Sequence, residues 1–275
     1  MPALRRFVAP GRTPPPFSPS GERASEKHVF GSISAVKRAL SSLRWRLALL
    51  FAGALACSTW TAHAQGRRVP DTIEQRMQAC TPCHGEQGRA SPIGYLPRIA
   101  GKPSAYLFNQ LVNFRDGRRY NAAMTYLVEQ LSDDYLREIA QYFGGLDVPY
   151  PPPPTTSERD GLLRRGEMVV TRGDINHRVP ACTQCHGYTL TGALPAIPGL
   201  LGLPADYVIA QLGAWKTGNR HAVAPDCMAE VAKRLSPEDV RAVAVWLASR
   251  PVPAGAKPVA RPELPLPLEC GSGLR

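Results

Sequence analysis

The amino-acid sequence predicts an all-α protein built from two tandem domains. An internal repeat supports this, because "LPRIAGKPSAYLFNQLVNFRDGRR" in the first half aligns with "IPGLLGLPADYVIAQLGAWKTGNR" in the second half. Apolar residues recur at helical spacing in both copies, and no segment shows convincing alternation with the period of two that marks a strand. The proline-rich stretch "LDVPYPPPPTTS" separates the copies and favours an extended linker. A repeat of about a hundred residues implies two similar domains rather than a solenoid.

Three helices are expected in each copy. They lie over residues 71–82, 104–116 and 133–143 in the first copy. In the second copy residues 166–184 include the first helix, and the others lie over residues 205–216 and 237–249; the middle helix of each copy has apolar residues at helical spacing. Ser132 and Ser236 are N-cap candidates for the last helix of each copy, because acidic residues follow each serine in the next turn.

The N-terminal segment has the features of an export signal. Residues 1–46 carry nine Lys and Arg against two Glu, and the apolar run "LALLFAGALA" that follows is too short to span a bilayer comfortably. The sequence "AHA" ending at Ala64 fits the small-x-small rule for signal peptidase. We therefore expect residues 1–64 to be removed and the mature protein to be periplasmic. A lipid anchor at Cys57 is the alternative, and membrane association is otherwise not predicted.

Removal of this segment also changes the charge of the chain. The full sequence has a formal charge of +11, whereas the mature chain keeps 24 basic and 20 acidic residues, a net charge of +4. No stripe of Lys and Arg interleaved with aromatic residues is left in it. Nucleic acid is therefore excluded as a partner.

Two copies of C-x-x-C-H indicate the chemistry of the chain: "CTPCHG" begins at Cys80 and "CTQCHG" begins at Cys182. A thioredoxin-type redox pair would lie in a βαβ context, which is missing, and a zinc site would need two such pairs closing on one metal. The third interpretation is the attachment motif of haem c. Because the motif occurs twice behind an export signal, we predict two covalently bound haem c groups, each with one iron.

The spacing within the motif suits this chemistry. Cysteines at i and i+3 face one side of a helical turn, so that each thiol adds to one haem vinyl group and the next histidine supplies the proximal nitrogen. The predicted attachment and proximal residues are Cys80, Cys83 and His84 in the first copy, and Cys182, Cys185 and His186 in the second copy.

The second axial ligand of each iron is expected to be a methionine. Met124 and Met228 recur at equivalent loop positions after the two motifs, although a three-residue insertion is needed to align them. The alternative is that both fill the core, as methionine often does. Met77 and Met168 precede their motifs and are interpreted as packing residues.

The sequence resembles the dihaem cytochromes of the cytochrome c4 type, which are tandem class I cytochrome c domains. The resemblance is carried by "CTPCHGEQG", "CTQCHG", the Y-x-x-x-Q-L segments at Tyr106 and Tyr207, and the paired methionines, and it covers residues 71–250. It implies an all-α fold of two tandem class I cytochrome c domains, and in this chain the proline-rich linker joins them. The sequence departs from the family in Cys227, in the linker and in the tail after Arg250.

The resemblance also implies how each iron is held. It implies His/Met ligation, and it implies that a proline carbonyl accepts a hydrogen bond from Nδ1 of each haem histidine, which would fix the ring. The residues concerned are His84, Met124 and Pro97 in the first copy, and His186, Met228 and Pro198 in the second copy. The alternative role of the two prolines is to stiffen their loops.

Five segments are expected along the chain. They are a removed N-terminal segment, a first cytochrome c domain, a linker, a second cytochrome c domain and a C-terminal tail, spanning residues 1–64, 65–146, 147–157, 158–250 and 251–275. For the tail, docking to a partner protein and disorder remain equal alternatives.

The expected ligand sets point to electron transfer. An iron with both axial positions filled has no open site for a substrate and can only change oxidation state, and thioether ligation raises its potential. We therefore expect a periplasmic electron carrier, not an enzyme, that takes electrons from a dehydrogenase or quinol-oxidising complex and passes them to a terminal oxidase or reductase. The alternatives are a dihaem peroxidase, which would keep one switchable iron site, and a cytochrome subunit docked permanently to an oxidoreductase.

Two cysteines remain once the signal is removed and four cysteines bind haem. We predict that Cys227 and Cys270 form a disulfide, because a free thiol in an oxidising compartment is exposed to oxidation. The alternatives are a free Cys227 packed beside the haem and an intermolecular bridge through Cys270.

Overall fold

The computed structural model describes Trp45 and residues 69–91, 94–260 and 266–272. Apart from Trp45, the predicted signal over residues 1–64 and the alternative lipid anchor at Cys57 lie outside the described residues. The chain divides into two units, Met1–Arg68 and Val69–Arg275, and the second unit contains both repeats. Among the helices that the structure describes, none is long and apolar enough to cross a membrane.

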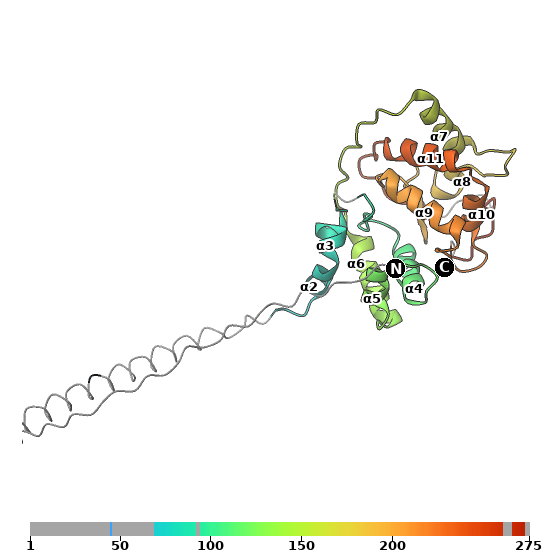
Figure 1. The fold of residues 1–275 in the computed structure, drawn as a ribbon. Helices are drawn as coiled ribbons and strands as arrows, with labels where there is room; N and C mark the ends of the chain where they lie inside the picture. The colour runs from blue at the N-terminus through green and yellow to red at the C-terminus, as the bar shows by residue number, and fades with distance from the viewer. Residues whose placement is uncertain (1–44, 46–68, 92–93, 261–265, 273–275) are drawn as a thin grey trace, which may run out of the picture. The chain divides into compact units, whose positions relative to one another are not determined.

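The repeat is visible in the order of the helices (Figure 1). The first copy contains α2 (Ile73–Arg76), η1 (Met77–Cys80), α3 (Thr81–His84), η2 (Glu86–Gly88), α4 (Ser104–Arg115), α5 (Ala122–Val128) and α6 (Asp133–Gly145). The second copy contains α7 (Asp160–Arg172), α8 (Cys182–His186), β1 (Gly192–Ala193), β2 (Ile197–Pro198), α9 (Ala205–Thr217), α10 (Cys227–Arg234) and α11 (Pro237–Ala248). The two strands have two residues each and pair antiparallel. The predicted all-α class is confirmed.

The prediction of one continuous helix over residues 71–82 is wrong. The first α-helical turn gives way to a 3₁₀ turn, and α3 begins a new helix at Thr81. Pro82 explains the break, because a proline has no N–H to donate to the carbonyl of Gln78. The Thr81 N–H and hydroxyl donate to that carbonyl instead, with the hydroxyl at 2.9 Å.

The counterpart predicted within residues 166–184 is also interrupted. Helix α7 ends at Arg172, and α8 begins only at Cys182. Gly173 ends α7, because its φ of +77° lies in the left-handed region and a Cβ there would lie 2.4 Å from the carbonyl oxygen of Val179. The loop between the two helices separates the haem motif from the long helix before it.

Both N-cap predictions are confirmed. The Ser132 hydroxyl accepts from the Tyr135 N–H at 3.3 Å, and the Ser236 hydroxyl accepts from the Asp239 N–H at 3.0 Å. The Asp239 carboxylate accepts in return from the Ser236 N–H at 3.4 Å, which completes a capping box. These caps start α6 and α11 where the sequence places them.

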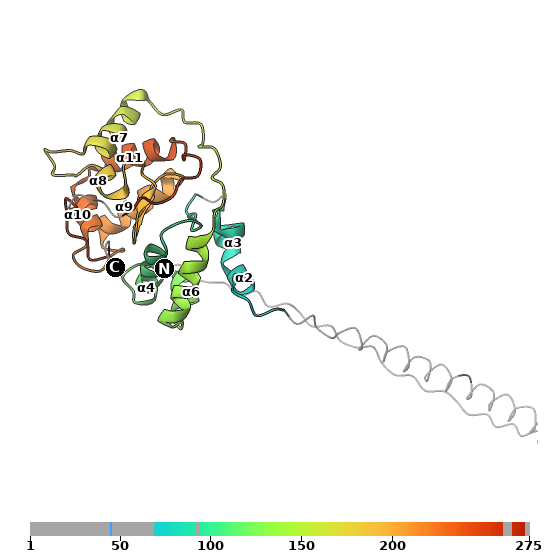
Figure 2. The same ribbon diagram turned by 180° about the vertical axis from the view of Figure 1, so that it is seen from behind.

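The first repeat has its own hydrophobic cluster, formed mainly where α4 packs on α6; these two helices lie side by side in Figures 1 and 2. The buried members are Met77, Leu107, Phe114, Val128, Leu136, Ile139, Ala140 and Phe143. Leu136 is completely buried, which stabilises the fold by about 1.5–3 kcal/mol relative to exposure. Met77 packs as predicted.

The second repeat has a separate cluster, formed where α11 packs on α7 and α9. The buried members are Val169, Val170, Val179, Leu190, Leu201, Val208, Leu212, Ala232, Leu235, Val240, Val243, Ala244, Trp246 and Leu247. The prediction that Met168 packs is wrong, because its position on α7 leaves it 37% exposed.

The linker and the tail lie against the repeats. Arg98 donates to the carbonyls of Val148 and Pro149, and its guanidinium lies 3.8 Å from the ring centroid of Tyr150. In the tail, the Val259 backbone exchanges two 2.9 Å hydrogen bonds with β1 and the residue after it. The described part of the tail is therefore docked on the second repeat.

Candidate functional site

Each motif histidine is held by a proline carbonyl. His84 Nδ1 lies 2.9 Å from the Pro97 oxygen, and His186 Nδ1 lies 2.7 Å from the Pro198 oxygen. Because a carbonyl only accepts, Nδ1 carries the hydrogen and Nε2 keeps its lone pair. The two histidines are therefore in the same tautomer, with the hydrogen on Nδ1.

Both imidazoles are neutral at neutral pH. Burial is the main cause that lowers the pKa of His84 and of His186, and the hydrogen bond to proline opposes it. The positive charge of Arg119 lowers the pKa of His84 further, and that of Lys102 lowers the pKa of His186 further. A neutral imidazole with a free Nε2 is the form that binds a metal.

The four motif cysteines are unpaired thiols. Burial raises the pKa of Cys80 and Cys185, and it raises the pKa of Cys182 to about 12. Cys182 and Cys185 lie one turn apart on α8, so their side chains share one side of the helix. Thiols placed in this way before a histidine match the requirements of haem attachment.

The competing interpretations of these cysteines fail on geometry. No group of three or more His, Cys, Asp or Glu side chains among the described residues is arranged to hold a metal ion, so the two pairs do not close on one zinc. The strands in the described part of the chain have two residues each, and a thioredoxin-type βαβ unit is not formed there.

Met124 and Met228 lie on short helices, not in loops as predicted. The Asn121 carboxamide caps α5 by accepting from the Met124 N–H at 3.0 Å, and the Asp226 carboxylate caps α10 by accepting from the Ala229 N–H at 3.1 Å. Each cap stabilises the first turn of a short helix that contains the methionine. Each methionine is partly buried against the cluster of its own repeat.

A polar cluster joins the two repeats. Arg119 and Arg220 face each other in an antiparallel bridge. Arg119 donates to Gln110 at 3.1 Å, to Gln211 at 2.7 Å and to the Tyr207 hydroxyl at 3.0 Å. Arg220 donates to Gln211 at 2.7 Å and to Gln110 at 2.9 Å. Each arginine therefore bonds to a glutamine from both repeats.

This cluster fits the carboxylates of haem. Arg119 and Arg220 are only 8% and 5% exposed, yet neither forms an ion pair with a carboxylate in the described part of the chain. The Trp215 Nε1–H is buried without an acceptor among the described residues, and the Arg220 guanidinium lies 3.7 Å from the Trp215 ring centroid. Buried cations favour a nearby anion and a buried N–H favours an acceptor, and the carboxylates of a haem would meet both needs.

Sequence reasoning assigned no role to this cluster. The signal was present, because Gln110 matches Gln211 and Arg119 matches Arg220 in the repeat alignment. Polar residues matched across a repeat were interpreted as marks of duplication and not as partners of each other.

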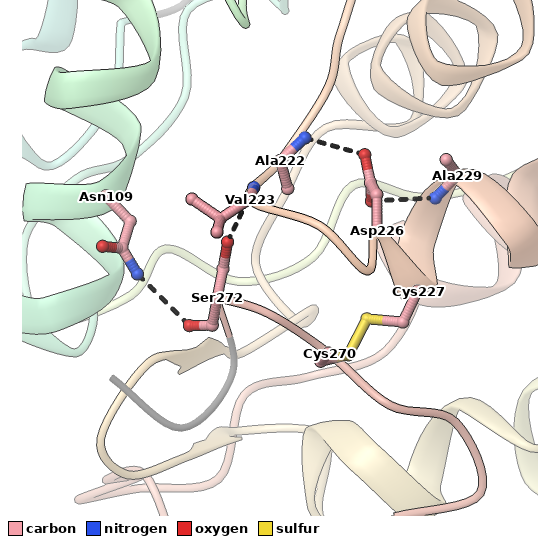
Figure 3. The surroundings of a disulfide bond; sticks show 8 residues. All are labelled: Asn109, Ala222, Val223, Asp226, Cys227, Ala229, Cys270 and Ser272. Atoms are coloured by element: carbon pink, nitrogen blue, oxygen red, sulfur yellow. Dashed lines mark hydrogen bonds between the residues drawn. A yellow bond between two sulfur atoms is a disulfide. The ribbon is translucent and has the colours of Figure 1, made fainter.

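The predicted disulfide between Cys227 and Cys270 is confirmed, so neither the free Cys227 nor the intermolecular bridge applies (Figure 3). The two Cα atoms lie 5.1 Å apart across 43 residues of sequence. Nearby, the Ser272 hydroxyl accepts from the Val223 N–H at 3.2 Å, and the Ser272 carbonyl accepts from the Asn109 side chain at 3.2 Å. The tail therefore contacts both repeats beside the helix that carries Met228.

Comparison with known proteins gives several dihaem relatives. No protein-family model matches the chain. It is 35% identical over 210 residues to a thiosulfate dehydrogenase electron acceptor of Thiomonas intermedia, covering 76% of this chain and 93% of that protein. It is 33% identical over 193 residues to cytochrome c4 of Pseudomonas aeruginosa, covering 69% of this chain and 91% of that protein.

Solved structures agree with these relatives. Reduced cytochrome c4 from Pseudomonas stutzeri matches with a TM-score of 0.56 and 29% identity, covering 64% of this chain and 95% of that chain. Thiosulfate dehydrogenase (TsdBA) from Marichromatium purpuratum matches with a TM-score of 0.57 and 35% identity, covering 63% of this chain but only 36% of that chain.

The cytochromes c4 and the thiosulfate dehydrogenase electron acceptor among these relatives are electron carriers, so the peroxidase alternative is not favoured. The fold is a tandem of two class I cytochrome c domains. The protein is an electron-transfer cytochrome with two covalently bound haem c groups, and it is not an enzyme. By sequence and by fold, this chain belongs to the dihaem, cytochrome c4-like family of c-type cytochromes.

Proposed function

We propose that each repeat holds one haem c through the residues of its own motif. Two cysteines would form the thioethers, and the histidine nitrogen and the methionine sulfur would be the protein ligands of the iron. The residues are Cys80, Cys83, His84 and Met124 for the first haem, and Cys182, Cys185, His186 and Met228 for the second haem. The observation that carries the proposal is the matched pair of Nδ1–H bonds to Pro97 and Pro198, which leave Nε2 free in both repeats.

The residues of the chain determine how electron transfer proceeds. When bound, haem supplies an iron centre that gains or loses one electron. The proline carbonyls hold the histidine rings and make Nε2 a stronger ligand, and the methionine thioethers favour the reduced iron. Arg119, Arg220 and Trp215 would supply hydrogen-bond donors to the propionates where the repeats meet.

We propose that the electron donor is a dehydrogenase of sulfur compounds, with thiosulfate dehydrogenase as the first candidate. Support comes from the relatives, two of which are named thiosulfate dehydrogenase electron acceptors. A shorter match of 32% identity over 68 residues is to a cytochrome subunit of sulfide dehydrogenase. The acceptor is a terminal oxidase or reductase, and the mature protein works in the periplasm.

We propose the domain limits that the sequence suggests. Residues 65–146 and 158–250 form the two cytochrome domains, with a linker over 147–157 and a tail over 251–275, after removal of residues 1–64. Support comes from the two hydrophobic clusters, each of which draws its buried members from one repeat.

Haem content and export are tested together by mass. The purified mature protein should begin at Gln65, carry no lipid and weigh its polypeptide plus two haems. A pyridine haemochrome assay should give two haems per chain. One haem per chain would contradict the two-site proposal, and a lipid at Cys57 would contradict the cleavage site.

The axial methionines are tested by spectroscopy. Met124→Ala and Met228→Ala should each remove about half of the weak red absorption band of iron–sulfur ligation. Met168→Leu is the matched control, because that methionine is exposed on α7. A high-spin haem in the wild-type oxidised protein, together with turnover of peroxide, would overturn the carrier assignment.

The donor is tested by mixing the oxidised cytochrome with thiosulfate and thiosulfate dehydrogenase. Both haems should be reduced only when the enzyme and thiosulfate are both present. Reduction by sulfide with sulfide dehydrogenase, and none with thiosulfate, would replace the proposed donor.

A further inference from the structure

Lys102 is a buried cation that crosses from the first repeat to the second. It lies in the loop before α4, is 4% exposed, and donates from Nζ to the carbonyl of Gly199 at 3.0 Å. It makes no ion pair with a carboxylate among the described residues. Burial, with a smaller effect of the Arg98 charge, lowers its pKa to about 8. A lysine is rarely buried without a carboxylate, because desolvation of its charge is costly.

The acceptor of this lysine adjoins the second haem site. Gly199 directly follows Pro198, whose carbonyl accepts the 2.7 Å hydrogen bond from His186 Nδ1. The ammonium group therefore lies next to the segment that holds the proximal histidine. Its positive charge comes from the other repeat, so it reaches the second site only while the two repeats are packed together.

Among the described residues, no lysine or arginine of the second repeat is found to act in this way on His84 of the first site. In the repeat alignment Lys102 matches Leu203, which is apolar. The neighbouring cation Arg98 is directed to the linker, where it donates to the carbonyls of Val148 and Pro149. Arg119 lowers the pKa of His84, but it belongs to the same repeat as that histidine, whereas the cation that acts on His186 comes from the other repeat.

We propose that Lys102 is a tuning residue that raises the reduction potential of the haem held by the second repeat. The inference rests on the proposed function, because it requires a haem at His186. Oxidised iron carries one more positive charge than reduced iron, so a nearby cation disfavours the oxidised state. A buried charge is screened far less than a surface charge. The step transfers one electron, and no bond forms or breaks.

The test is potentiometric titration of the mature, haem-loaded protein, followed by absorbance and resolved into two one-electron waves. The second-haem wave is the one displaced in Met228→Ala. Lys102→Gln keeps a hydrogen-bond donor but removes the charge, Lys102→Met removes both, and Lys102→Arg keeps both. Lys102→Gln and Lys102→Met should lower the reduction potential of the second wave relative to the first by about 59 mV, which is a tenfold change in the constant for electron partition between the two haems. Lys102→Arg should keep the wild-type potential.

Lys233→Gln is the matched control, because it removes a lysine of the second repeat whose side chain is 62% exposed, and it should leave both waves unchanged. The proposal is overturned if Lys102→Gln shifts the potential of neither wave or shifts both potentials equally. It is also overturned if the second wave keeps its wild-type potential in Lys102→Gln but is lowered in Lys102→Met. The last result would assign the effect to the hydrogen bond. A wild-type protein with a single one-electron wave would instead show that the two-haem proposal has failed.

Discussion

Arg165 holds carboxylates from two elements of the second repeat. Its Nε lies 2.6 Å from Asp239 at the start of α11, and its Nη2 lies 2.8 Å from Asp174 in the loop after α7. The hydrogen bonds from Arg165 are the main cause that holds the pKa of both carboxyl groups below the ordinary range, and His177 adds to the effect at Asp174. One side chain therefore fixes the loop that leads to the second haem motif.

This network predicts acid sensitivity. Carboxylates whose folded-state pKa is lowered contribute stability that is complete above their unfolded pKa of about 3.9 and is lost as the pH falls through the folded value. The melting temperature, followed by circular dichroism, should therefore fall below about pH 5. Arg165→Met should lower it at pH 7 and make the decline toward pH 3 shallower. Arg164→Met, an exposed neighbour, should keep the wild-type profile. Parallel profiles for wild type and Arg165→Met would contradict the assignment.

At the scale of elements, the crossing of α7 and α11 depends on Gly166. A Cβ at this position would lie 2.2 Å from the Ala242 carbonyl oxygen and 2.7 Å from the Trp246 Cβ. The first contact is with backbone, which has no rotamer to change. The glycine therefore lets the two helices approach closely in the second core.

Substitution of this glycine should separate the helices. Gly166→Ala is expected to destabilise the protein by about 1–3 kcal/mol, because overpacking exceeds the gain in helix propensity. Gly161→Ala on the same helix is the control, since its Cβ would meet nothing within 4 Å, and it should be neutral or slightly stabilising. Denaturant unfolding of both variants decides the point, and equal stabilities would show that the crossing tolerates a methyl group.

At the scale of the whole molecule, the C-terminal tail is bonded to three separate parts of the second unit. The disulfide joins it to α10, Val259 pairs with β1, and Ser272 contacts Asn109 of the first repeat. The helix that carries Met228 is thus held from a distant part of the sequence, as Figure 3 shows at the disulfide.

Loss of the disulfide should lower the free energy of unfolding by a measurable amount. Cys227→Ser and Cys270→Ser should each destabilise the oxidised protein by about 3–4 kcal/mol, from the loop entropy of the 43-residue separation. The two variants should agree, and a reducing agent should bring wild type to the same stability. Denaturant titration measures the loss, and alkylation of the unfolded, unreduced wild type should find no free thiol. A disulfide-linked dimer on a non-reducing gel would contradict the intramolecular bond.

Much of the fold is predictable from local patterns. Ser132 and Ser236 start their helices because capping depends on contacts within one turn. The helices predicted over residues 104–116 and 205–216 agree with α4 and α9 to within one residue at each end. The helix over residues 71–82 was mispredicted although its cause, Pro82, is also local. A proline near a helix start is usually tolerated, and its position after a completed turn made it disruptive here.

The duplication, the two haem motifs, the paired methionines and, by elimination, the cysteines of the disulfide are all readable from the amino-acid sequence alone. These follow from spacing along the chain and from covalent chemistry. Only the tertiary structure showed that Arg119 and Arg220 share glutamines across the repeats, and that Lys102 reaches Gly199. The physical reason is that the cost of burying a charge, and the partner that offsets it, depend on which distant segments packing brings together, and the repeat alignment matches equivalent positions without showing which residues touch.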